Sequence, residues 1–287
     1  MSSSPGPPAG SPPPHGWAGP AWAPPAPATG PPPPPPYPRG GRAGADDRPV
    51  CPAAPLAGEA RRQARIELAV VGFVTAAPGI VVGLRGLNDP ASVNTEIAVL
   101  DLIGLVVASF GPAVLVAYLL WREGSLRLAG FGRPKAAPTV GWGVVGLLAC
   151  AAAVVLAAVV LGIIINLTGG DPQDTTDSGP EVSSAIGSIV AALAIAATAG
   201  ISEEAVYRGY GITRMEQAGW PRAALWAPWL VWTAQHLYAG PGALVVVGAV
   251  GIPLVWLFWW RRSIWPVVVA HALYNVGVFA LNLIVVD

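Results

Sequence analysis

Charged residues are scarce in this chain of 287 amino acids: Asp, Glu, Lys and Arg make up 11%, against 53% hydrophobic residues. This shortage of charge excludes an ordinary soluble domain. The 16 basic and 16 acidic residues balance, and no basic face interleaved with aromatic side chains is present, which argues against a nucleic-acid partner. Of only two cysteines, Cys51 lies in a proline-rich segment and Cys150 in an apolar one. Neither a disulfide framework nor a thiolate metal site is supported.

Residues 1–60 differ in composition from the rest of the chain. They hold 20 of the 32 prolines, including the run from Pro31 to Pro36, and they lack apolar periodicity. This composition predicts a disordered tail with polyproline II character. A solvated spacer is the favoured interpretation, and the alternative is a docking tail for a proline-recognising partner.

Residues 61–287 form the predicted transmembrane helical domain, because they contain apolar segments near the ~20 residues that a helix needs to cross the hydrocarbon core. Basic residues cluster in the tail and after the second, fourth and sixth segments, which predicts a cytoplasmic N-terminus. The sequence therefore predicts an all-α, polytopic transmembrane helix bundle with a disordered tail. Its Gly-, Ala- and Pro-rich composition suggests a bacterial plasma membrane. We expect about seven spans, at 66–84, 97–121, 140–167, 182–208, 223–238, 243–260 and 264–286.

Three charges interrupt the fourth apolar segment: Glu203, Glu204 and Arg208. Charges at membrane depth are expensive, and by default they are functional. On a helix Glu204 and Arg208 share a face and can pair, whereas Glu203 points roughly 100° away from Glu204. This division predicts that one carboxylate has a structural role and that the other takes part in the chemistry. The alternative is a helix that leaves the bilayer with a surface ion pair.

The predicted membrane region contains only two histidines, His236 and His271. Asn275 lies four residues after His271 and shares its helical face. Buried polar side chains in hydrocarbon must find partners, so we expect these groups to converge inside the bundle with the glutamates. One histidine alone would indicate an interhelical hydrogen bond, but six polar groups on three helices favour a functional site.

These residues fall into three motifs whose order resembles the signature of the CPBP intramembrane proteases. That family includes the CAAX prenyl endopeptidases and the bacteriocin-immunity (Abi) proteins. The resemblance covers roughly residues 130–285. It departs at one aromatic position, where the family usually has Phe, and we expect packing to tolerate the change. The motifs are Glu203-Glu204-x-x-x-Arg208, Trp232-x-x-x-His236 and His271-x-x-x-Asn275.

The resemblance implies hydrolysis of a peptide bond by activated water. Glu203 matches the catalytic glutamate and, with His236, would deprotonate the attacking water. His271 and Asn275 match the pair thought to stabilise the oxyanion. The second glutamate and the arginine of the first motif would form a buried structural ion pair.

The resemblance leaves two mechanisms, one with a metal and one without. Glu203, His236 and His271 could supply three ligands and leave an open position, as catalytic zinc requires. The sequence has no His-Glu-x-x-His motif, however, and the ligands would come from three separate helices. The family carries the label metalloprotease, but glutamate-activated water needs no metal, and the metal-free mechanism is favoured.

The leading hypothesis is an intramembrane endopeptidase that cleaves a membrane-associated peptide or protein from a cavity open to the cytoplasm. A prenylated CAAX protein is the best-known substrate of the family. One alternative is a proton-coupled transporter that uses the same Glu and His groups as a relay. The other is a non-enzymatic membrane scaffold or immunity protein recruited through the proline-rich tail.

Overall fold

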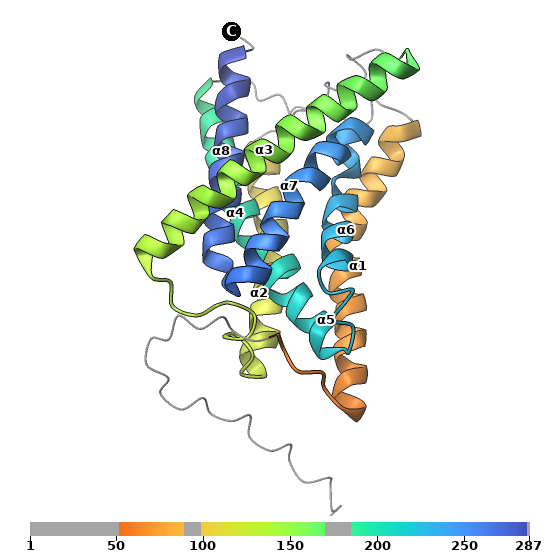
Figure 1. The fold of residues 1–287 in the computed structure, drawn as a ribbon, viewed down its shortest axis with the longest axis vertical. Helices are drawn as coiled ribbons and strands as arrows, with labels where there is room; N and C mark the ends of the chain where they lie inside the picture. Colours follow the sequence, from red (N-terminus) through yellow and green to blue (C-terminus); the bar gives the residue numbers. More distant parts are fainter. Residues whose placement is uncertain (1–51, 89–98, 170–184, 286–287) are drawn as a thin grey trace, which may run out of the picture. The chain divides into compact units, whose positions relative to one another are not determined.

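The computed structural model describes residues 52–88, 99–169 and 185–285. Most of the predicted tail, residues 1–51, lies outside these ranges. The regular secondary structure of the described residues consists of helices, without strands, which confirms the predicted all-α fold (Figure 1). The helices are α1 (Gly58–Asn88), α2 (Val99–Arg122), α3 (Ala136–Thr168), α4 (Ala185–Glu203), the π-helix η3 (Glu204–Ile212), α5 (Thr213–Gln217), α6 (Trp226–Gln235), the 3₁₀-helix η4 (His236–Ala239), α7 (Gly240–Arg261) and α8 (Ile264–Val285).

The surface of the bundle is apolar, as α3 shows most clearly. This helix runs obliquely across α7 and α8 and packs against both (Figure 1). Its buried positions are small residues, among them Gly143 and Gly146, whereas Leu148, Leu156 and Ile163 are exposed. Small residues facing the neighbouring helices and large apolar residues facing outward suit a helix surrounded by lipid.

Four helical stretches in the described part of the chain are long and apolar enough to cross a membrane. The protein is therefore an integral membrane protein, as predicted, although the expected count of about seven spans is not confirmed. The four stretches are Gly58–Asn88, Ala136–Thr168, Trp226–Arg261 and Ile264–Leu281.

The third stretch folds back on itself. Its first part, α6, has ten residues and is about 15 Å long, which is half of the ~30 Å hydrocarbon core. The chain turns through η4 and Gly240, whose φ of 87° favours glycine,. In α7 the backbone carbonyl of Gly248 accepts a 2.9 Å hydrogen bond from the indole N–H of Trp229 on α6. The expected fifth and sixth spans thus form a hairpin with His236 at its turn.

The π-helix η3 lies between the two hydrophobic cores of the bundle. All nine of its residues are buried. Ile212 belongs to the core that α3, α7 and α8 build, and Val206, Tyr207 and Tyr210 belong to the core shared with α1, α2 and α6. This position places the polar residues of the first motif at the centre of the packing.

Helix α1 approaches the hairpin turn backbone to backbone. A Cβ atom on Gly79 would collide with the backbone carbonyl of Gln235, and one on Gly83 would lie 2.5 Å from the carbonyl carbon of Leu237. Glycines four residues apart let two membrane helices meet this closely. The absence of side chains at these two positions therefore fixes η4, and with it His236, against α1.

We predict that Gly79→Ala destabilises the protein by about 1–3 kcal/mol, because an added methyl group in a filled contact forces the backbones apart. Equilibrium unfolding in mixed micelles, followed by circular dichroism, measures the change. Gly72→Ala on the same helix is the matched control, since a Cβ there meets no atom within 4 Å, and alanine should be neutral or stabilising in a helix. Equal stability of the two variants would contradict the close contact.

Candidate functional site

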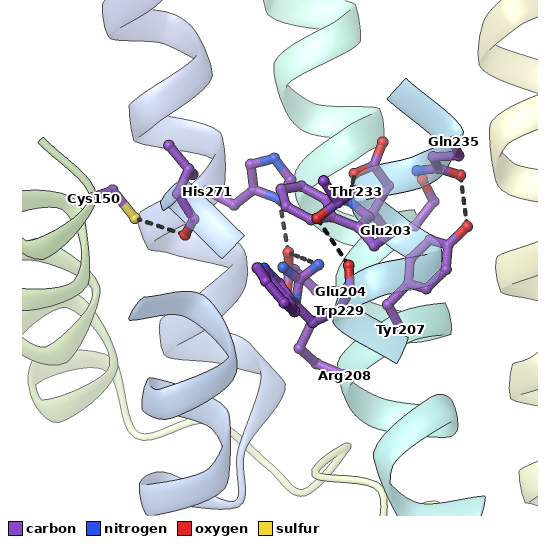
Figure 2. A network of polar contacts seen from close by, with 12 residues as sticks. Cys150, Glu203, Glu204, Tyr207, Arg208, Trp229, Thr233, Gln235 and His271 are labelled. Atoms are coloured by element: carbon purple, nitrogen blue, oxygen red, sulfur yellow. Dashed lines mark hydrogen bonds and ion pairs between the residues drawn. The ribbon is translucent and has the colours of Figure 1, made fainter. Parts of the chain in front are cut away.

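Glu204 is the first residue of η3, and its side chain is fully buried. Arg208 Nη1 lies 3.2 Å from Glu204 Oε1, and His271 Nδ1 lies 2.7 Å from the same oxygen (Figure 2). A carboxylate oxygen only accepts hydrogen bonds, so the His271 Nδ1–H donates to Glu204. One buried carboxylate thus joins the first motif to α8.

The contact between η3 and α8 depends on small residues in the two helices that carry it. A Cβ atom on Gly200 of α4 would lie 3.0 Å from the Cβ atom of Ala272. Gly200 stands one helical turn before Glu204, and Ala272 directly follows His271. Because only a methyl group separates the helices here, His271 reaches Glu204 without a longer side chain intervening.

Trp232 lies at the centre of the site and contacts Glu203 and Arg208. Its indole N–H donates a hydrogen bond to Glu203. Its ring lies under the guanidinium of Arg208, at 4.3 Å, which is a cation–π distance,. The same ring meets the rings of His236 and His271 edge-on, with centroids 5.0 and 5.9 Å apart. This buried side chain therefore connects all three motifs.

The guanidinium of Arg208 depends on these neighbours because it is buried with few hydrogen-bond acceptors. Among the residues that the structure describes, none accepts a hydrogen bond from its Nε or Nη2. The Glu204 carboxylate and the face of Trp232 are thus the groups that offset its charge. Loss of either would leave a cation with little compensation in an apolar bundle.

His236 is the first residue of η4, and the backbone of α6 sets its tautomer. Its Nδ1 lies 2.8 Å from the backbone carbonyl of Trp232. A carbonyl only accepts, so Nδ1 carries the hydrogen, and in the neutral ring the lone pair is on Nε2. That nitrogen is the one available to accept a proton.

Glu203 and His236 line the same cavity, whose volume is about 250 Å³. Glu203 is half-buried and lines the cavity, whereas its neighbour Glu204 is buried and does not line it. The structure thus brings the first and second motifs together around one space. The lining consists of Val74, Thr75, Pro78 and Gly79 from α1, Pro112 from α2, Ser202, Glu203, Val206 and Tyr207 from α4 and η3, and Gln235, His236 and Tyr238 from the hairpin turn.

The third motif lies differently from the first two. His271 is buried against Glu204, and neither it nor Asn275 lines the cavity. The Asn275 side chain is half-buried, and it makes no hydrogen bond within the described ranges. His271 and Asn275 share α8, but within the described residues no hydrogen bond joins the amide of Asn275 to Glu203.

Sequence reasoning missed two functional features of this site. The first is Trp232, which was expected to be replaceable aromatic packing but donates a hydrogen bond that Phe could not. The second is the pair formed by Tyr207 and Gln235, which both line the cavity and are joined by a 2.6 Å hydrogen bond. Gln235 directly precedes His236 in a largely apolar segment, and that isolated amide was the available signal.

The candidate metal ligands Glu203, His236 and His271 do not form a common ligand set. Within residues 52–88, 99–169 and 185–285, no three His, Cys, Asp or Glu side chains gather in a way that could hold a metal ion. One oxygen of Glu203 accepts from Trp232, and Nδ1 of His271 donates to Glu204. The residues present therefore do not fit a zinc ion as they stand, and we derive no step through one.

The bundle and its site define a class: a helical membrane protein with a buried glutamate–arginine–histidine group beside a cavity lined by a second glutamate and histidine. Residues 185–277 match a family model described as type II CAAX prenyl endopeptidase Rce1-like. The chain carries an Rce1-like domain over these residues, and the resemblance to the CPBP intramembrane proteases is confirmed. All three motifs fall within the match, whereas α1, α2 and α3 lie outside it. Neither a curated protein nor a solved structure matches the chain significantly.

We predict that Glu204→Ala lowers the free energy of unfolding by about 3–5 kcal/mol, because it leaves Arg208 buried without its carboxylate. Denaturant titration of the purified protein in mixed micelles measures the loss. Glu59→Ala is the control: Glu59 pairs with Arg62 at 3.3 Å, but both side chains are more than two-thirds exposed, so its removal should change stability by less than about 0.5 kcal/mol. A Glu204→Ala protein as stable as the control would refute the structural role.

A third stability prediction concerns Trp232→Phe. The phenyl ring cannot donate to Glu203 and is a weaker partner for Arg208, so we expect a loss of about 1–3 kcal/mol. The same titration measures it, with Trp121→Phe as the control because Trp121 is 67% exposed. If both substitutions prove equally mild, Trp232 acts as aromatic packing alone.

Proposed function

We propose that the chain is an intramembrane endopeptidase that hydrolyses a peptide bond of a membrane-associated protein with water activated by Glu203 and His236. The observation that carries this proposal is the convergence of two side chains of the Rce1-like domain, Glu203 and His236, on one cavity. The cavity is large enough to admit both water and part of a peptide, because a water molecule occupies about 30 Å³ of liquid volume.

In the proposed reaction, Glu203 removes one proton from a water molecule that also donates a hydrogen bond to His236 Nε2. The resulting hydroxide adds to the carbonyl carbon of the scissile bond, and the carbonyl oxygen becomes an oxyanion. The proton then passes to the amide nitrogen as the C–N bond breaks. The products are a carboxylic acid and an amine, and both side chains return to their starting states.

Glu204, Arg208 and His271 act in this proposal as a buried anchor for Glu203. Glu203 and Glu204 are adjacent at the junction of α4 and η3, so fixing the second carboxylate fixes the direction of the first. The role of His271 and Asn275 in stabilising the oxyanion stays a prediction from the resemblance. With its Nδ1 donating to Glu204, His271 would have to act through its other ring nitrogen.

The proposed substrate class is a CAAX-type prenylated C-terminus, which is the substrate that the family description names. Five of the residues that line the cavity belong to α1 and α2, and four of these are apolar or glycine, which suits a substrate delivered from the membrane. We further propose that the cavity opens to the cytoplasm of a bacterial cell, on the same side as the N-terminus, as the distribution of Lys and Arg indicates.

The proposal predicts that Glu203→Gln lowers the kcat/KM of peptide cleavage by about 10²–10⁴-fold, because the amide cannot take a proton from water. The protein is assayed in nanodiscs with an internally quenched peptide that ends in an S-farnesyl CAAX sequence. Glu59→Gln, an exposed substitution at the start of α1, is the control and should cleave at the wild-type rate.

Three results separate this function from its alternatives. Cleavage that survives both Glu203→Gln and His236→Ala would overturn the proposal, as would flux of protons or solutes in proteoliposomes without any cleavage. If the wild type does not cut the farnesylated peptide, membrane peptides are compared between cells carrying the wild type and Glu203→Gln. Products found only with the wild type would support the proposed protease activity but contradict the proposed CAAX substrate class. If no such products are found, both the protease activity and the substrate class are overturned.

A further inference from the structure

We infer that Gln235 is a further hydrogen-bond donor that binds the carbonyl oxygen of the scissile peptide bond, in addition to the contribution predicted for His271 and Asn275. This inference rests on the proposed function and adds a residue that lies outside the three motifs. Gln235 is the last residue of α6, directly precedes His236, and lines the cavity together with His236 and Glu203. A donor at this position would lie beside both groups that activate the water.

The orientation of the Gln235 amide is fixed by Tyr207. The Tyr207 hydroxyl donates to Gln235 Oε1 at 2.6 Å, and the tyrosine is 4% exposed. Figure 2 shows the amide with its oxygen turned to Tyr207. Both hydrogens of Nε2 are therefore turned away from Tyr207, and within the described part of the chain no acceptor takes them. A side-chain amide held in this way offers two donors of fixed direction.

The backbone of Gln235 is also held in place. Helix α1 meets it at Gly79 so closely that a Cβ atom there would collide with the Gln235 carbonyl. An amide clamped at its backbone by α1 and at its oxygen by Tyr207 needs little reorganisation when a substrate binds. Pre-organised donors of this kind are effective in stabilising charge that develops in a transition state.

The other hydroxyl groups around the cavity are mostly engaged. Thr75 donates to the carbonyl of Val71 at 2.6 Å, and Ser202 donates to the carbonyl of Thr198 at 2.5 Å. Tyr238 keeps a hydroxyl that makes no hydrogen bond within the described residues, but this side chain is 44% exposed. Gln235 is therefore the better-ordered neutral donor in the cavity.

The chemistry of the proposed reaction calls for a neutral donor here. As water adds to the carbonyl carbon, negative charge grows on the carbonyl oxygen, close to the carboxylate of Glu203. A lysine or arginine at this position would pair with Glu203 and suppress its basicity. The amide of Gln235 can donate to the oxygen without neutralising the glutamate, and the contact strengthens as charge develops.

The test compares four substitutions in nanodiscs, with the farnesylated peptide or, if that is not cut, the peptide identified by the membrane comparison. Gln235→Met removes both the donor and the acceptor for Tyr207. Gln235→Glu keeps an acceptor for Tyr207 but removes the amide donor. Tyr207→Phe removes the orienting hydroxyl and keeps the amide. Tyr238→Phe removes the other hydroxyl at the cavity.

Donation to the oxyanion predicts that Gln235→Met and Gln235→Glu each lower kcat by about 10²–10³-fold, with a much smaller change in KM. Tyr207→Phe should lower kcat by about tenfold at most, since the amide remains, and Tyr238→Phe should lower it less than Gln235→Met does. Circular dichroism and unfolding in mixed micelles establish that each variant is folded before its rate is compared.

Several results would overturn the inference. If Gln235→Glu keeps its kcat while Gln235→Met and Tyr207→Phe lose theirs equally, Gln235 serves only to hold Tyr207. A larger loss in Tyr238→Phe than in Gln235→Met would transfer the role to Tyr238. Glu203→Gln separates the two proposals: if it is inactive and Gln235→Met is fully active, only this inference fails, whereas an active Glu203→Gln removes the proposed function as well.

Discussion

The buried carboxylate of Glu204 is the interaction on which the site depends. It offsets the charge of Arg208 and accepts a hydrogen bond from His271, so one oxygen atom ties η3 to α8. A charge pair in an apolar bundle contributes little net stability, but removing one partner is costly. This asymmetry explains why the carboxylate holds η3 and α8 in place. If either helix moved, Arg208 or His271 would lose its contact with Glu204 in an apolar environment that cannot solvate it.

The hairpin of α6 and α7 brings His236 to the same membrane depth as Glu203. Straight spans of the expected length would put His236 and Glu203 at different levels, because the histidine follows a long apolar segment and the glutamate lies near a helix end. Instead α6 stops after ten residues, and the chain turns at η4. The histidine therefore lies at the turn of a short hairpin, where α1 packs against it and Glu203 lines the same cavity.

Composition and spacing predict the all-helical membrane fold and the residues of the three motifs, because scarce charges in an apolar chain are conspicuous. They do not predict the π-helix of residues 204–212, since a local change in hydrogen-bond register leaves no mark on apolar periodicity. They predict that His271 converges with the glutamates but not which of the two it contacts, and close packing at Gly200 places it against Glu204. The hydrogen bond from Trp232 to Glu203 was hidden by the assumption that aromatic residues interchange.

The wall that α1 contributes has a consequence for how such proteins diverge. The three motifs lie within residues 185–277, but Val74, Thr75, Pro78 and Gly79 of α1 close one side of the cavity from outside that segment. Inheritance of the domain therefore does not fix the shape of the space in which a substrate would lie. Two chains could share every motif residue and still accept different peptides, because an N-terminal helix can change its sequence without disturbing the buried charges.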